Sequence, residues 1–261
     1  MAKTAHSVRR VAAASGDVSM ATDLPAFDPL YKQIRKLLVQ RLEGHAWKPG
    51  QIIPTELELS KLFGVSQGTV RRALDELVAE NILIRRQGKG TFVASHTEPT
   101  HHYRFLRLSP LDGAQEQPER RLVKFHRVRA SEAVAKALEV KAAEPLLLLR
   151  RLLVFQGIPT VLEDISLPAK MFKGLTAAKF EERHGYIYEL LEGDYGVKMV
   201  RATEKVTAVA ATPEVANSLD VPEHSPLLCV ERVAFTYRDR PVEFRRGYYR
   251  TDRHFYMSEL G

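Results

Sequence analysis

Residues 54–93 constrain the fold of this chain more than any other stretch, because they predict two short helices joined by a tight turn. Thr55 and Glu58 have the spacing of a capping box, which satisfies free backbone donors where a helix begins. Gly64 is expected to end that helix in a left-handed conformation, and Ser66 to cap the next one. A turn of about three to four residues is typical of a helix-turn-helix.

Apolar side chains predict how these two helices pack. Leu59 and Leu62 give the first helix one apolar face. Val70, Leu74 and Leu77 recur at helical spacing in the second. The turn holds the second helix clear of the first, so its opposite face can enter a major groove. That face carries Gln67, Thr69, Arg71 and Arg72.

A short hairpin is predicted directly after the second helix. Residues 82–86 alternate as a strand, Gly88 and Gly90 provide turn freedom, and residues 91–93 return. The basic tip can reach backbone phosphates or a minor groove. An ordinary helical pair beside a solvated hairpin is the alternative, but the joint pattern is more specific than its fragments. The tip comprises Arg85, Arg86, Gln87 and Lys89.

The residues before this stretch complete the predicted head. A first helix is expected to begin at Asp28 or Pro29 and to end at Gly44. Trp47 is interpreted as a core anchor, and residues 52–53 as a short strand that pairs with the hairpin. The apolar face of the first helix is predicted to consist of Leu30, Ile34, Leu37, Leu38 and Leu42.

Residues 29–93 resemble the winged-helix reading head of GntR-family bacterial transcription regulators. The resemblance rests on PLYKQI, the Pro49-Gly50 turn, PTELELSKLFGVSQGTVRRALDEL and RRQGKGTFV. This chain departs from the family pattern at two places. Leu57 stands where the family often has Arg. Gln67-Gly68 stands where the family commonly has Arg followed by a residue with a side chain. Both places touch DNA in the family. The resemblance implies a DNA-binding set of Thr55, Glu56, Ser66, Gln67, Gly68, Thr69, Arg71, Arg72, Arg85, Arg86, Gln87, Gly88 and Lys89.

Charge is concentrated where this head lies. The net charge is +7, and residues 26–95 hold 11 Lys/Arg against 7 Asp/Glu. Residues 96–261 are nearly balanced, with 25 against 23. A polyanionic partner is therefore expected to meet the head, and double-stranded DNA is the predicted partner.

Composition limits the other possibilities. Cys229 is the single cysteine, so no intramolecular disulfide can form and a reducing cytoplasm is the expected location. No metal-ligand spacing and no stretch apolar enough to span a bilayer occurs, so neither cofactor nor membrane partner is expected. Residues 1–25 are interpreted as a disordered tail, in which Met20 is an alternative start to Met1.

An internal repeat organises the rest of the chain. SEAVAKALEVKAAEPLLLLRRLLV, from Ser131, aligns without gaps with TPEVANSLDVPEHSPLLCVERVAF, from Thr212. Each copy predicts a capped short helix, an apolar strand, a turn and a returning strand. Residues 186–191 predict a helix and residues 197–211 a strand between the copies. Residues 103–108 and 122–128 are candidate strands before them.

The predicted fold class is α+β, a winged helix-turn-helix followed by a mainly antiparallel sheet with helices on one side. We place a winged helix-turn-helix domain at 26–94, a linker at 95–102, and a second domain at 103–261. The last part is similar to the UTRA domain of HutC-type GntR regulators, a fold shared with chorismate lyase. The resemblance covers roughly residues 103–258 through EPLLLLRRLLVFQGIPTVLEDISLP and RPVEFRRGYYRTDRHFY. It implies metabolite binding, dimerisation and control of DNA binding.

Charged residues on the apolar strands are the candidate effector site. Arg151 and Arg232 occupy equivalent repeat positions, and charges on core strands must pair with each other or meet a ligand. From the residues alone, ligand binding and ion pairing of Arg151, Arg232, Glu163 and Glu243 on an exposed strand face are equally good interpretations. The resemblance favours a ligand and implies the set Arg151, Glu163, Glu243, Arg245 and Tyr249.

One departure narrows the chemistry of that ligand. Relatives that bind sugar phosphates carry Arg-x-Arg here, whereas this chain has Leu153 at the second position. A single Arg suits a carboxylate better than a phosphate dianion. We therefore expect a transcriptional regulator, a repressor, that binds a palindromic operator as a homodimer under control of a carboxylate-bearing metabolite. A chorismate lyase-like enzyme and a non-specific architectural DNA binder are the alternatives.

Overall fold

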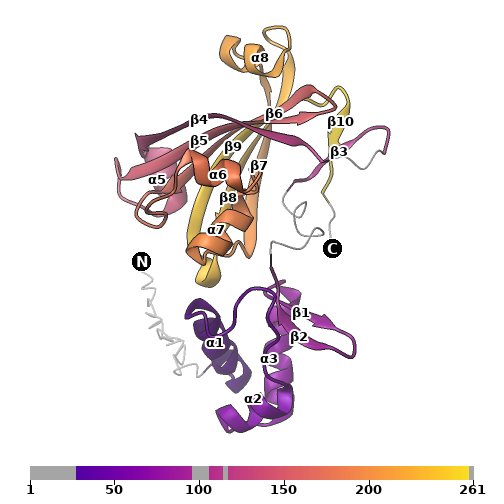
Figure 1. Cartoon of the computed structure of the whole chain (residues 1–261), viewed down its shortest axis with the longest axis vertical. Coiled ribbons are helices and arrows are strands. Elements are labelled where there is room, and N and C mark those ends of the chain that lie inside the picture. Colours follow the sequence, from indigo (N-terminus) through magenta and orange to yellow (C-terminus); the bar gives the residue numbers. More distant parts are fainter. Residues whose placement is uncertain (1–27, 96–105, 114–116, 259–261) are drawn as a thin grey trace, which may run out of the picture.

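The computed structural model describes residues 28–95, 106–113 and 117–258, which form a small head and a larger sheet domain (Figure 1). The head comprises residues 28–94, and the sheet domain comprises the described residues from 106 onward. The predicted tail at 1–25 and residues 96–102 of the predicted linker lie outside the described residues. Residue 95 of that linker is described and is buried.

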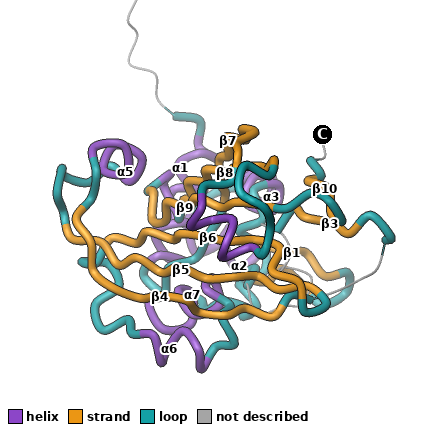
Figure 2. The backbone as a smooth tube through the Cα atoms, turned by 90° about the horizontal axis from the view of Figure 1, so that it is seen from above, coloured by secondary structure: helices purple, strands orange, loops and turns teal. Residues whose placement is uncertain are grey.

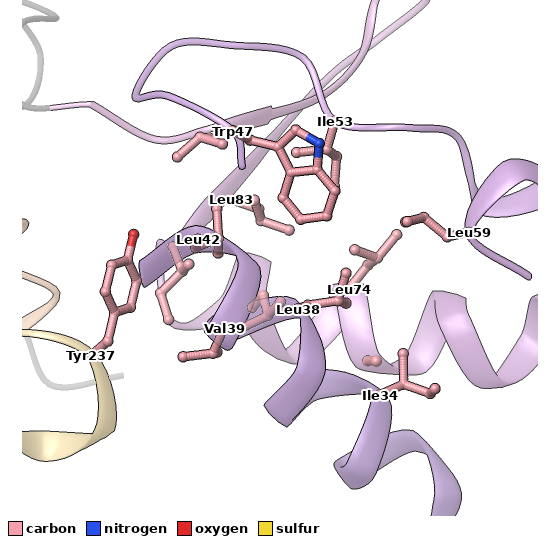
Figure 3. Close-up of a cluster of buried hydrophobic side chains, with 14 of the residues drawn as sticks. Ile34, Leu38, Val39, Leu42, Trp47, Ile53, Leu59, Leu74, Leu83 and Tyr237 are labelled. Carbon is pink, nitrogen blue, oxygen red and sulfur yellow. The ribbon is translucent and has the colours of Figure 1, made fainter. Parts of the chain in front are cut away.

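The head contains three helices and one hairpin. Its core gathers apolar side chains from all three helices around Trp47, which confirms the predicted anchor (Figure 3). Ile52 forms a bridge with Phe92 of the hairpin, as predicted. The elements are α1 (Leu30–Glu43), α2 (Glu56–Phe63), α3 (Gln67–Ala79), β1 (Leu83–Arg86) and β2 (Gly90–Val93).

The apolar stripes of α1 and α2 are narrower than predicted. Leu30, Leu37 and Leu62 are 49%, 42% and 52% exposed, so the prediction was wrong for these three. On α1 the buried positions repeat every four residues, through Ile34 and Leu38. Leu37 is rotated about 100° from that row, and Leu30 is the first residue of the helix, where the row ends.

The sheet domain is built on six strands in the order β4-β5-β6-β9-β8-β7, and every neighbouring pair is antiparallel. A separate two-stranded ribbon, β3 with β10, lies at one end. The strands are β3 (Leu108–Pro110), β4 (Glu119–Arg129), β5 (Pro145–Phe155), β6 (Ile158–Pro168), β7 (Arg201–Ala210), β8 (Pro226–Phe235), β9 (Pro241–Tyr249) and β10 (His254–Tyr256). The helices are α5 (Glu132–Leu138), α6 (Ala177–Glu182), α7 (Ile187–Tyr195), α8 (Pro213–Leu219) and the 3-10 turn η1 (Tyr237–Asp239).

The two repeat copies have the predicted structure. Ser131 and Thr212 accept hydrogen bonds from backbone amides and cap α5 and α8. Each helix leads into a hairpin, β5–β6 in the first copy and β8–β9 in the second. The hairpins meet where β6 pairs with β9, so the middle of the sheet is the junction of the two copies.

Helices cover both faces of this sheet, which corrects the prediction of helices on one side (Figure 2). Leu146 of β5 packs with α5 residues, whereas its neighbour Leu147 packs with α6 and α7. Successive side chains of a strand point to opposite faces, so α5 and α6–α7 lie on opposite sides. The repeats carry α5 and α8; α6 and α7 come from the segment between the copies, where only one helix was predicted.

Candidate DNA interface and effector site

The N-terminal end of α3 presents a small polar surface. Ser66 caps α3 by accepting a hydrogen bond from the Thr69 amide, and its hydroxyl lies 2.9 Å from Thr69 Oγ1. Gln67 and Gly68 are exposed on the first turn. A Cβ added at Gly68 would meet only Ser66 Oγ at 3.9 Å, so the glycine leaves open space beside Gln67.

Glu56, at the start of α2, organises two of the predicted DNA-contacting arginines. Its Oε2 lies 2.8 Å from Arg71 Nη2, and its Oε1 lies 3.3 Å from Arg85 Nη2. Arg85 also meets Asp75 of α3 at 2.5 Å. The hydrogen bond from Arg71 to Glu56 raises the pKa of that guanidinium. Because a carboxylate repels phosphate, this geometry favours a positioning role for Glu56 rather than direct contact with DNA.

Two other predicted arginines stack on aromatic rings. The guanidinium carbon of Arg72 lies 3.9 Å from the ring centre of Tyr31, and that of Arg86 lies 4.7 Å from the ring centre of Phe92. Stacking restrains a long side chain while its N–H groups keep their edges outward. At the hairpin tip, Gly88 has φ of 69°, a conformation that favours glycine.

Thr55 has a local structural role at the N-terminus of α2. Its side chain accepts from the Glu58 amide, and its own amide donates to Glu58 Oε2 at 2.8 Å. This confirms the predicted capping box. The structure therefore places the predicted set on α3, its cap, the start of α2 and an exposed hairpin tip that includes Gln87 and Lys89.

The predicted effector residues come together on one face of the sheet. Arg151 faces Glu163 across β5 and β6, and Glu163 faces Gly247 across β6 and β9. Glu243, Arg245 and Tyr249 share the parity of Gly247 on β9 and therefore share its face. All five side chains are buried. The ion-pair interpretation placed these pairs on an exposed face, and that part was wrong, because α6, α7 and the β3–β10 ribbon cover this side.

Glu163 contacts three other members of this group. Its Oε2 lies 2.7 Å from Arg151 Nε, and its Oε1 lies 2.9 Å from Arg245 Nη1. Tyr249 donates its hydroxyl to the same Oε1 at 3.3 Å. Burial alone would raise the pKa of Glu163, but Arg151 and Arg245 outweigh it and hold that pKa below the ordinary value of 4.5. Glu163 is therefore a buried carboxylate that stays charged.

A second arginine–glutamate group adjoins the first. Arg232 of β8 pairs with Glu204 of β7 at 2.5 Å, and Tyr256 of β10 donates its hydroxyl to Glu204. Tyr188 of α7 donates its hydroxyl to Glu243 Oε1 at 3.2 Å. Glu204, Tyr188 and Tyr256 were not predicted as site residues, although the strand parity of Glu204 was a usable signal. We call the whole set the buried charge cluster: Arg151, Glu163, Tyr188, Glu204, Arg232, Glu243, Arg245, Tyr249 and Tyr256.

Two polar atoms of the buried charge cluster have no hydrogen-bond partner among the described residues. They are Oε2 of Glu243 and Nη2 of Arg245, whose residues are 0% and 4% exposed. Arg245 Nε already bonds Glu243 Oε1 at 2.8 Å, so the two open positions belong to one pair. On the same face of β9, Gly247 is covered by the Tyr249 ring so closely that an added Cβ would lie 2.5 Å from it. The pair offers one donor and one acceptor to a small polar ligand.

Metal-ligating, membrane-spanning and thiol groups are the remaining features of the described part of the chain. It contains no group of three or more His, Cys, Asp or Glu side chains arranged to hold a metal ion. None of its helices is long and apolar enough to cross a membrane. Its single cysteine, Cys229, is buried, and burial raises the pKa of that thiol.

Known proteins resemble this chain in both parts. The family description "Bacterial regulatory proteins, gntR family" matches residues 30–93, and the UTRA domain matches residues 113–254. The repressor NagR of Bacillus subtilis (strain 168) is 27% identical over 236 residues, which cover 89% of this chain and 95% of NagR.

Two solved structures also match. The ligand-binding domain of a protein assigned to the GntR family in Bordetella bronchiseptica is 44% identical, with a TM-score of 0.59, and covers 61% of this chain and 99% of its own. PhnF from Mycobacterium smegmatis is 26% identical, with a TM-score of 0.51, over 87% of this chain and 99% of its own. This chain therefore belongs to the gntR family of bacterial regulatory proteins, as a DNA-binding transcriptional regulator with a C-terminal UTRA domain.

Proposed function

We propose that this regulator is a repressor that binds a palindromic operator as a homodimer in the cytoplasm. Each chain offers one α3, and a single recognition helix reads only a few base pairs. Two-fold pairing of chains doubles the number of base pairs that are read. The sheet domain is the expected dimerisation unit, which is consistent with the UTRA match over residues 113–254.

The buried charge cluster is the proposed effector site. The observation that carries this proposal is the open pair, Glu243 Oε2 and Arg245 Nη2, buried without partners in the described residues. Leaving a buried polar atom unsatisfied costs about 1–3 kcal/mol. A ligand that brings a carboxylate oxygen to Arg245 and a hydroxyl or amine hydrogen to Glu243 removes both costs.

The expected ligand is a small polar, carboxylate-bearing metabolite that lies between the two repeat hairpins. The charges of Arg151, Arg245, Glu163 and Glu243 already balance one another. A phosphate dianion would add two negative charges to a buried and balanced group, at a high cost in desolvation. Leu153, which stands in place of a second arginine, also disfavours a phosphate-bearing ligand.

Control of DNA binding then follows from linkage. A ligand shifts an equilibrium only through its different affinities for two states. The effector must therefore prefer an arrangement of the two heads that does not match the spacing of the operator half-sites.

Footprinting of the full chain on fragments of its own chromosome tests this proposal. We expect one discrete palindromic protection, which a compound from a panel of small polar carboxylates releases. Protection without a discrete boundary would instead support an architectural DNA binder. Consumption of added chorismate would support the enzyme alternative.

A further inference from the structure

The head and the sheet domain are joined by a buried lysine. Lys198, between α7 and β7, is 3% exposed, and its Nζ donates to the backbone carbonyl oxygens of Ala94 and Ile82, the latter at 3.2 Å. Both carbonyls belong to the head, because Ile82 directly precedes β1 and Ala94 directly follows β2. An ammonium group is costly to bury unless it keeps hydrogen bonds, so this placement holds only while the head stays in contact.

Glu192, on α7, makes a second polar contact at the same junction. Its Oε2 accepts a hydrogen bond from Ser95 Oγ at 2.9 Å, and both residues are 4% exposed. The end of α7 also touches the head directly at Gly196, where an added Cβ would lie 2.3 Å from the His45 ring.

The turn between β8 and β9 adds apolar and ionic contact to the junction. Tyr237 packs into the core of the head, beside Val39 and Leu42 (Figure 3). Arg238 pairs with Glu43 of α1 at 2.6 Å. This turn connects the strands that carry Arg232 and Arg245 of the buried charge cluster.

The same helix reaches the cluster and the head. Tyr188 donates to Glu243 of the cluster, whereas Glu192, four residues later, accepts from Ser95. Residues four apart lie one turn apart on a helix, about 6 Å along its axis. A rotation or shift of α7 that follows a change at Tyr188 must therefore move Glu192 and the segment that carries Lys198.

We propose that Glu192 and Lys198 are positioning residues that hold the head against the sheet domain, and that α7 transmits the state of the buried charge cluster to this contact. The first part stands on the contacts alone. The second part deepens the proposed function and rests on it, because it takes the cluster to be the effector site.

We call the contacts of Lys198 with Ala94 and Ile82, and of Glu192 with Ser95, the clamp. Distances between spin labels test the clamp in the full chain without DNA or effector. Cys229→Ser removes the native thiol, and Lys61→Cys on α2 with Glu181→Cys on α6 provides two exposed labelling sites. Mixing with an excess of unlabelled chain keeps at most one labelled copy in any dimer. We expect one narrow distance distribution for this parent protein.

Lys198→Met should weaken the clamp while it keeps side-chain length. The ratio of docked to undocked heads should fall by roughly ten-fold or more, because the variant loses both charged hydrogen bonds from Nζ. Lys205→Met, on the exposed part of β7, is the matched control and should leave the distribution unchanged. Ser95→Ala removes only the hydroxyl that meets Glu192, and it tests the same contact if the lysine variant does not fold.

The outcomes separate the two parts of the proposal. A distribution as narrow as that of the parent in both Lys198→Met and Ser95→Ala overturns the clamp. Tyr188→Phe, which loses the hydroxyl bonded to Glu243, should shift the distribution although it lies outside the head. If Tyr188→Phe leaves the distribution unchanged while Lys198→Met broadens it, the clamp stands and transmission through α7 is refuted. None of these readouts depends on the effector, so failure of the proposed effector site is recognised separately.

Discussion

Arg245 of β9 and Glu163 of β6 join the two repeat copies, with Nη1 of the arginine 2.9 Å from Oε1 of the glutamate. The pair lies at the centre of the sheet, where the hairpins meet, and both side chains are buried. Buried ion pairs of this kind contribute little net stability, but removing one partner leaves an uncompensated charge. A ligand that competed for one partner would therefore be expected to alter how the two copies pack.

The acid sensitivity of the fold should depend on Glu163. Its pKa lies below 4.5 in the folded chain, so its contribution to stability is fully present above about pH 4.5. That contribution is lost as the pH falls toward the depressed folded value. Glu163→Gln should lower the free energy of unfolding by about 3–5 kcal/mol at pH 7. Urea unfolding of parent and variant between pH 7 and pH 3 should show the difference shrinking in acid; a constant difference contradicts this assignment.

Base preference at one symmetric operator position should depend on Gln67. Glutamine favours bidentate contact with adenine, whereas arginine favours guanine. Gln67→Arg should shift the preference toward guanine by about 1–3 kcal/mol, and Gly68 leaves room for the longer side chain. Selection of binding sites from random DNA measures this for both proteins. An identical consensus would refute a base contact by Gln67.

Lys89 at the hairpin tip should act through phosphate. It is exposed and lies beyond the ion pairs that hold Arg85. Lys89→Ala should weaken operator and unrelated DNA alike, and should reduce the slope of log affinity against log salt by about one. Lys173→Ala, in an exposed loop of the sheet domain, is the control and should change neither quantity. A loss confined to the operator would instead assign Lys89 to base readout.

Binding should require two chains on one DNA. A palindrome should be bound far more tightly than its isolated half-site, because each α3 reads only one half. Gel-shift titration against both DNA lengths, with sedimentation of the complex, measures affinity and stoichiometry together. Equal affinity for the half-site with one chain per DNA would contradict the dimer.

The head could be predicted in detail because its signals are local. The capping box at Thr55 and the left-handed end at Gly64 each depend on residues within one turn. The alternation of side chains along a strand likewise makes it predictable that Glu243, Arg245 and Tyr249 share a face. The partners of that face could not be predicted: Glu204 meets Arg232 through the register of β7 on β8, which no local pattern specifies. Lys198 contacts a carbonyl 104 residues away, and only the packing of head on sheet brings them together.

Release from DNA should depend on Arg151, while DNA binding should not. Arg151 lies far along the chain from α3, and its partners are Glu163 and the Gly185 carbonyl oxygen, 2.7 Å from Nη1. Arg151→Ala removes one donor of the proposed effector site, whereas Glu163 keeps its bond to Arg245. We expect unchanged operator affinity and loss of release by the compound that the panel screen identifies. Arg150→Ala is the matched control, because Arg150 is the preceding residue on β5, points to the opposite face and pairs with Asp164 at 2.7 Å. That variant should keep both operator binding and release. If Arg151→Ala unfolds and loses DNA binding while Arg150→Ala does not, Arg151 is a structural ion-pair residue, and the ion-pair interpretation of this strand is the correct one.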